Sequence, residues 1–89
     1  MYLHLGQETV VMQDDIVGIF DLDNTTVSKS TRDYLAKKEK EKKVINVSFE
    51  LPKTFVLTNN KNEGSKVYIS QISSSTLLKR ADNIYEINK

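Results

Sequence analysis

The chain has 89 residues and a formal net charge of +1, a size that predicts a single domain over residues 1–89. It contains no cysteine, which excludes disulfides, a thiol nucleophile and thiolate metal ligands. No apolar run approaches the roughly 20 residues of a membrane helix, and no signal-like segment opens the chain. We therefore expect a soluble cytoplasmic protein with no membrane partner.

The charges are unevenly distributed along the chain. Residues 1–28 hold five acidic and no basic side chains, whereas residues 29–89 hold all 13 basic ones and seven acidic ones. This asymmetry permits a basic face for a polyanion, and it equally permits head-to-tail self-association through opposite charges.

The first quarter of the chain predicts short strands. Tyr2–Leu5 and Thr9–Met12 flank a tight turn at Gly6-Gln7, and Asp14-Asp15 separates them from the apolar run Ile16–Phe20. Such short connections favour an antiparallel meander.

The apolar run leads into Asp21, Asp23 and Thr25. This Asp-x-Asp-x-Thr spacing resembles the first motif of haloacid-dehalogenase-type phosphatases, which implies a nucleophilic carboxylate, a second carboxylate as acid/base and a magnesium ion. That fold needs a doubly wound sheet, and only about two strand–helix–strand units of roughly 30 residues fit after the motif. No second acidic pair follows an apolar run. We therefore expect no catalytic residue, metal or cofactor, and a structural role for both aspartates.

A first helix is predicted after the capping side chains of residues 24–26. Its single apolar stripe consists of Val27, Thr31, Tyr34 and Leu35. Beyond the stripe, Lys37–Lys43 is charged on every side, which is more typical of a solvated helix end than of a basic tether for phosphates.

The hydrophobic period then changes to two. Ile45–Leu51 predicts a half-buried strand with Ile45, Val47, Phe49 and Leu51 on its inner face, ended by Pro52. Thr54–Thr58 and Lys66–Ser70 predict two more strands, joined by a polar hairpin loop over residues 59–65.

A second helix is predicted after the capping run Ser73–Thr76. Its apolar stripe consists of Leu77, Leu78, Ala81, Ile84 and Tyr85. The stripe packs on the sheet or partly on a neighbouring subunit, because so small a domain has a limited core. The elements together predict an α+β fold, a small antiparallel-rich sheet with two helices.

Four segments together resemble one family, the RemA/RemB extracellular-matrix regulatory proteins of Gram-positive bacteria. The opening MYLHLGQETVV is similar to the Tyr-x-His-Leu-Gly start of the RemB type, and DDIVGIFDLDNTT is similar to its Asp-Ile-Val-Gly-Ile-Phe-Asp segment. PKTFVLT and ISSSTLLKRA resemble the family's later strand and helix. The resemblance runs from residue 1 to about residue 87.

The resemblance implies a regulator of biofilm genes that forms a ring-like homo-oligomer and binds double-stranded DNA through arginines. It also implies that Asp21 ends a strand in proteins that are not phosphatases. Where RemA-type members carry cations, however, this chain reads Gln13-Asp14-Asp15 and Leu51-Pro52-Lys53. Because DNA affinity depends on phosphate neutralisation, the architecture carries over better than the DNA contacts.

The sequence thus favours a homo-oligomeric transcriptional regulator, with Lys53, Lys79 and Arg80 as nucleic-acid-binding candidates and Leu77, Leu78 and Tyr85 as interface candidates. The alternative is a protein-interaction or structural module of the same fold that has lost DNA binding. A magnesium-dependent phosphatase that uses Asp21 and Asp23 is a distant third.

Overall fold

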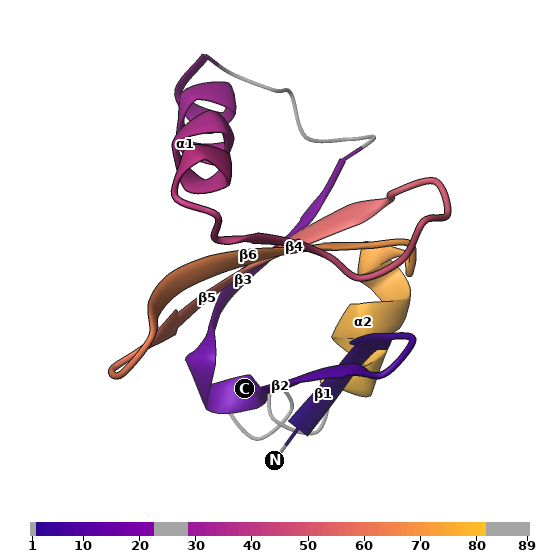
Figure 1. Ribbon diagram of the computed structural model, residues 1–89. Coiled ribbons are helices and arrows are strands. Elements are labelled where there is room, and N and C mark those ends of the chain that lie inside the picture. Colours follow the sequence, from indigo (N-terminus) through magenta and orange to yellow (C-terminus); the bar gives the residue numbers. More distant parts are fainter. Residues whose placement is uncertain (1, 23–28, 82–89) are drawn as a thin grey trace.

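A computed structural model describes residues 2–22 and 29–81 (Figure 1). The elements in chain order are β1 (Tyr2–Gly6), β2 (Thr9–Met12), the short 3-10 helix η1 (Gln13–Asp15), β3 (Ile16–Asp21), α1 (Lys29–Lys40), β4 (Val44–Asn46), β5 (Thr54–Asn60), β6 (Gly64–Ser70) and α2 (Ser74–Arg80).

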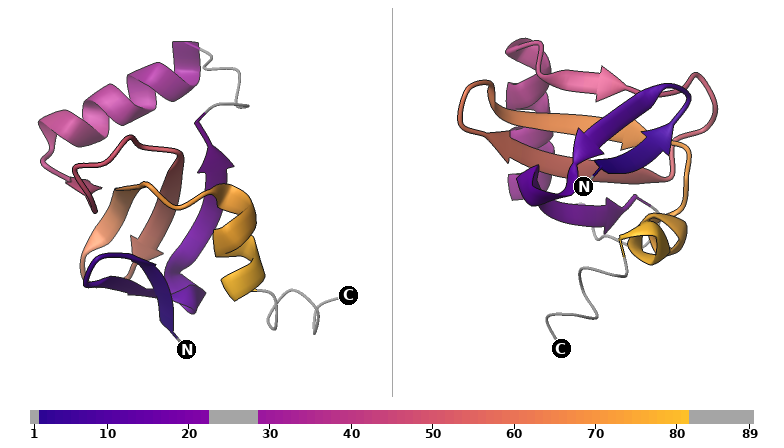
Figure 2. Two further views of the ribbon diagram at one scale, coloured as in Figure 1. Left: turned by 90° about the vertical axis from the view of Figure 1, so that its right-hand side faces the viewer. Right: turned by 90° about the horizontal axis from the view of Figure 1, so that it is seen from below.

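The strands form a four-stranded sheet in the order β3-β5-β6-β4 and a separate two-stranded hairpin of β1 and β2. All pairings are antiparallel except that of β4 with β6, which is parallel. Helix α1 lies on one face of the larger sheet, and the hairpin and α2 lie on the other (Figures 1 and 2). The predicted α+β fold with two helices and an antiparallel-rich sheet is confirmed.

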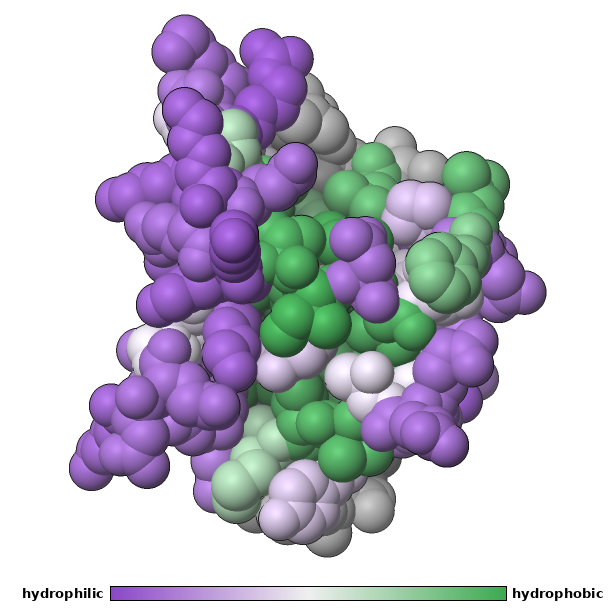
Figure 3. All heavy atoms as spheres, viewed as in Figure 1, coloured by the Kyte–Doolittle hydropathy of each residue, from purple (hydrophilic) through white to green (hydrophobic). Residues whose placement is uncertain are grey.

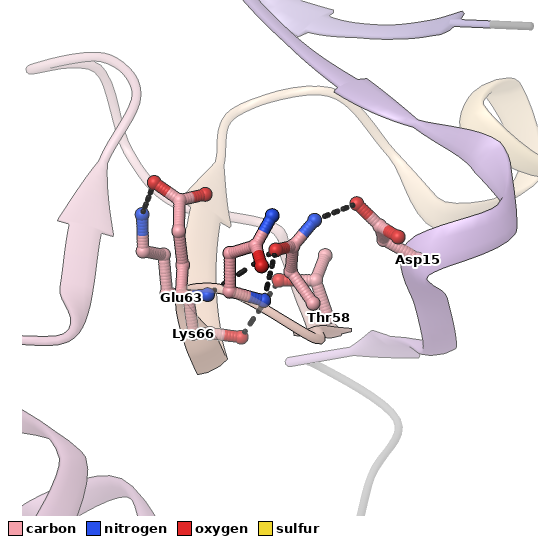
Figure 4. Close-up of polar contacts among 6 residues, drawn as sticks. Asp15, Thr58, Glu63 and Lys66 are labelled. Atoms are coloured by element: carbon pink, nitrogen blue, oxygen red, sulfur yellow. Dashed lines mark hydrogen bonds and ion pairs between the residues drawn. The ribbon is translucent and has the colours of Figure 1, made fainter.

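The predicted meander of the first three strands is wrong. Strands β1 and β2 form the expected hairpin, but β3 pairs with β5 and not with β2. The hairpin folds over the sheet and forms a second layer. Its inner side chains Leu3, Leu5 and Val11 are buried in the cluster between the two layers. Asn60 Nδ2 donates to Asp15 Oδ2 at 3.1 Å and so ties η1 to the end of β5 (Figure 4).

The predicted strand over residues 45–51 is too long, since β4 ends at Asn46. Strand β4 lies on one side of β6 and β5 lies on the other, so the intervening chain must cross the end of β6. Val47 N donates to Ile69 O and Lys53 N donates to Ser70 O, both at 2.9 Å, which marks this crossing. Val47 is buried as expected, whereas Phe49 and Leu51 are exposed.

The core lies between the larger sheet and the layer that the hairpin and α2 form. Its buried members are Leu3, Leu5, Val11, Val47, Val56, Leu77 and Ala81. The buried Ser70 hydroxyl donates to Leu5 O at 2.6 Å and accepts from Ile72 N at 3.0 Å, so it joins the hairpin to the approach to α2. The predicted cap of α2 is confirmed, because the side chain of Ser73 accepts from Thr76 N.

Helix α1 contributes no buried residue. Its predicted stripe is present only in part: Thr31 and Leu35 are half-buried, Tyr34 is 37% exposed, and Val27 lies outside the described residues together with the predicted caps at 24–26. The Lys38 ammonium lies 5.6 Å from the centre of the Tyr34 ring and 3.3 Å from Glu41 Oε1. Most of the charged run is exposed, as predicted for a solvated helix end, but the Lys38 side chain is only 13% exposed and Lys43 is half-buried. The helix ends at Lys40.

Candidate nucleic-acid interface

Lys53 immediately precedes β5, and two hydrogen bonds hold its backbone. Its N–H donates to Ser70 O at 2.9 Å, and its carbonyl accepts from Leu22 N at 2.8 Å. The side chain is exposed. An exposed ammonium on a fixed backbone suits contact with a phosphate, because little backbone entropy is lost on binding.

Lys79 and Arg80 occupy the last turn of α2, and both are exposed. Cations at the C-terminal end of a helix are stabilised by its dipole. Arg80 Nη1 donates to His4 O at 3.0 Å, which fixes the guanidinium beside β1 and leaves its other donors available.

The structure does not gather the three candidate cations into one cluster. Lys53 is bonded to Ser70, which precedes α2, whereas Arg80 lies at the other end of that helix. Helix α2 is about 10 Å long, given a rise of about 1.5 Å per residue over its seven residues, and Arg80 lies at the end farther from Ser70 along the chain. One subunit therefore offers two separated contact points.

The loop over residues 47–53 exposes two large apolar side chains that the alternating sequence pattern had placed on the inner face of a strand. Phe49 is 108% exposed and Leu51 is 81% exposed, on the same loop as Lys53. The loop overhangs a pocket of about 270 Å³ lined in part by Asn46, Pro52 and Gln71. Large apolar side chains in full contact with water are typical of interaction surfaces.

The three interface candidates have different positions. Leu77 is fully buried in the core of the monomer itself, whereas Leu78 is 41% exposed. Tyr85 and Ile84 lie outside the described residues. Of the two described candidates, only Leu78 has surface left for a partner.

Asp21 is bonded to the second helix. Ser74 Oγ in the first turn of α2 donates to Asp21 Oδ2 at 3.2 Å. Asp23 and Thr25 lie outside the described residues. Among the described residues, no group of three or more histidine, aspartate or glutamate side chains is arranged to hold a metal ion.

The family model for RemA-like proteins, described as extracellular matrix regulatory protein A-like, matches residues 2–81. The chain belongs to this family. It is also 43% identical over 88 residues to extracellular matrix regulatory protein B of Bacillus subtilis (strain 168), and the match covers 99% of each chain. The resemblance drawn from the four sequence segments is thereby confirmed.

Membership in the RemA-like family does not assign a role to any single residue of this chain. Neither helix in the described part of the chain is long and apolar enough to cross a membrane. On the face shown in Figure 3, hydrophilic residues gather over α1, and a band of hydrophobic residues runs down the middle of the molecule.

Proposed function

We propose that the chain is a small, cytoplasmic, homo-oligomeric transcriptional regulator of extracellular-matrix genes that binds double-stranded DNA. The observation that carries the proposal is Lys53, an exposed cation on a fixed backbone in the loop where the resemblance to RemA-type proteins places arginines. Lys79 and Arg80 supply a second contact point at the far end of α2.

Assembly is essential to this function, because each subunit offers few cations. The three candidates would each neutralise about one phosphate, and each phosphate contributes only a modest counterion-release term. Several subunits on one duplex multiply the contacts and raise the avidity. Since the sequence contains only two arginines, Arg32 and Arg80, contacts should be mostly to phosphates, with little dependence on base sequence.

A DNA titration at low and at moderate salt tests the proposal. We expect wild type to bind at low salt and to weaken steeply as salt rises. Lys53→Glu and the double variant Lys79→Ala/Arg80→Ala should each bind more weakly. Lys61→Glu, which changes an exposed lysine in the turn between β5 and β6, is the matched control and should bind like wild type.

The outcomes separate the parts of the proposal. If wild type shows no binding even at low salt, DNA binding is refuted. If wild type binds and neither Lys53→Glu nor the double variant weakens it, the assigned surface is wrong.

The exposed Leu78 is the candidate for self-association. We expect Leu78→Asp to lower the native mass measured by light scattering while circular dichroism remains that of a folded chain. Leu77→Ala is the contrasting variant, because that side chain lies in the core and should lower stability without acting directly on the assembly. A monomeric wild type at micromolar concentration would contradict homo-oligomerisation.

A second candidate function is a protein-interaction module that regulates without contacting DNA. The exposed Phe49 and Leu51 favour it, because they stand where cations would be needed for DNA. On this reading, Phe49→Ser/Leu51→Ser should abolish regulation of a matrix-gene reporter in cells, while Lys53→Glu leaves it unchanged. If the protein instead acts by binding DNA, Lys53→Glu should abolish regulation of the reporter and Phe49→Ser/Leu51→Ser should leave it unchanged.

A further inference from the structure

We propose that the pocket beneath the loop over residues 47–53 binds the adenine base of a free nucleoside. The proposal is independent of DNA binding, because it concerns a small-molecule site whose lining does not include the Lys53 side chain.

Hydrogen bonds hold the pocket in shape. Its volume is about 270 Å³, which lies just below the roughly 300–1,000 Å³ that is typical of ligand sites. Each end of the loop is tied to the end of β6 by a backbone hydrogen bond of 2.9 Å. Within the loop, Glu50 N donates to Ser48 Oγ at 3.1 Å. The pocket therefore suits a small ligand and loses little loop freedom when it receives one.

Two side-chain amides line the pocket. Asn46 comes from the last residue of β4, and Gln71 from the residue after β6. Both amides offer a donor and an acceptor, and a turn about the last side-chain bond of glutamine exchanges the two.

The Gln71 amide is positioned closely but is not fully bonded. A Cβ added at Gly6 would come within 2.9 Å of Gln71 Oε1, so the glycine leaves the space that this amide occupies. Gln71 Oε1 is buried and has no hydrogen-bond partner among the described residues. An unpaired buried acceptor is costly, so a ligand that lets the amide turn and pair removes that cost.

An amide beside an aromatic ring indicates the ligand class. The donor and acceptor of an amide match the N7 acceptor and N6 donor of adenine, whereas guanine presents two acceptors at the same edge. Phe49 also lines the pocket, and its exposed ring offers a face on which a base can stack. Ser48 adds a hydroxyl, which can donate or accept.

Glu50 favours a nucleoside over a nucleic-acid strand. It is exposed and is the charged member of the pocket lining. A carboxylate accepts hydrogen bonds from ribose hydroxyls, as in dinucleotide-binding sites, and it repels phosphates. A strand would bring phosphates beside Glu50, and a free nucleoside would not.

Isothermal titration calorimetry with adenosine tests the proposal. We expect one adenosine to bind per chain, and guanosine and single-stranded oligodeoxyadenylate to bind more weakly. The NMR shift changes caused by adenosine should centre on residues 46–50 and 69–71, which hold most of the pocket lining.

Two substitutions should weaken adenosine binding. Phe49→Ser removes the stacking face and Gln71→Glu removes the amide donor, and each should weaken binding at least about five-fold. Phe49→Tyr keeps a ring and should bind like wild type. Leu51→Ser and Asn62→Asp are the matched controls, because Leu51 is exposed on the same loop without lining the pocket, and Asn62 is an exposed amide in the turn between β5 and β6. Circular dichroism checks that each variant is folded.

The proposal is overturned if wild type does not bind adenosine at millimolar concentration, or if folded Phe49→Ser binds it like wild type. Guanosine that binds as tightly as adenosine overturns the assignment of the base, and oligodeoxyadenylate that binds more tightly overturns the free nucleoside. These measurements involve neither duplex DNA nor native mass, so their failure leaves the proposed function standing. Conversely, a wild type that binds adenosine but no duplex DNA refutes the proposed DNA binding alone.

Discussion

The two sides of the four-stranded sheet are covered in different ways. On one side the hairpin and α2 bury Leu3, Leu5 and Leu77, each at most 1% exposed. On the other side α1 runs for 12 residues without one buried side chain. The hairpin side therefore holds the buried cluster, and the other side carries a helix that exposes most of its surface.

The cause of this difference is visible in the composition of the helices. Seven of the 12 residues of α1 are charged, and its described apolar stripe contains one threonine, one tyrosine and one leucine. A helix gains most of its stability in proteins from packing an apolar face, so α1 is expected to be held less firmly. The first two predictions compare matched substitutions on the two sides.

Leu5→Ala should have the largest effect. Leu5 is fully buried, and removing such a side chain costs about 2–5 kcal/mol in the free energy of unfolding. Leu35→Ala, the same substitution on the half-buried position of α1, should cost about 1 kcal/mol. Urea denaturation followed by circular dichroism measures both. Equal costs would show that α1 is packed as firmly as the hairpin.

Ser70→Ala should have the next largest effect. The Ser70 hydroxyl is buried and bonded to Leu5 O and Ile72 N. Its loss leaves a buried carbonyl and a backbone N–H without a partner, which costs about 1–3 kcal/mol. Ser30→Ala on the exposed surface of α1 should change stability by less than about 0.5 kcal/mol. If the Ser70→Ala variant is as stable as wild type, the hydroxyl does not contribute to holding the two layers together.

The secondary structure that depends on local signals was predictable. The β1–β2 hairpin, the β5–β6 hairpin and the Ser73 cap each follow from turn residues, alternation or a capping side chain within a few positions. The family, too, could be inferred from short motifs spread along the chain, and the family model confirms it.

What depends on long-range pairing could not be predicted. Alternation at residues 45–51 predicts a strand, but it does not reveal that β4 pairs in parallel with β6 and that the chain must then cross the end of β6. The exposure of Phe49 and Leu51 results from that crossing. Likewise, the separation of Lys53 from Arg80 depends on where α2 packs, which no local pattern encodes.

Ser73→Ala should lower stability by about 1 kcal/mol, because the helix loses the side-chain acceptor for the Thr76 N–H. Ser73→Asp keeps an acceptor at this position and should stay within a few tenths of a kcal/mol of wild type. Thermal unfolding of the three proteins measures the difference. If Ala and Asp destabilise equally, the cap is not what stabilises the start of α2. Because α2 packs on the side of the sheet that holds the buried core, the loss of stability in Ser73→Ala should appear in the global unfolding transition.

Asp21→Asn should have the smallest effect on stability, and it also decides between a structural and a catalytic role. Asp21 Oδ2 accepts from Ser74 Oγ in the first turn of α2, where a carboxylate is typically stabilised by about 0.3–1 kcal/mol. Asparagine keeps an acceptor oxygen and loses the charge, so the cost should lie within that range. Asp33→Asn on α1, which removes the exposed ion pair with Lys29, should cost close to nothing and serves as the control on the other side of the sheet.

With magnesium and a phosphate ester, we expect no phosphate release above background from wild type or either variant. Release by wild type that Asp21→Asn abolishes and Asp33→Asn leaves intact would instead make Asp21 a nucleophile, because removing a nucleophile lowers the rate by orders of magnitude whereas a weakened helix contact does not.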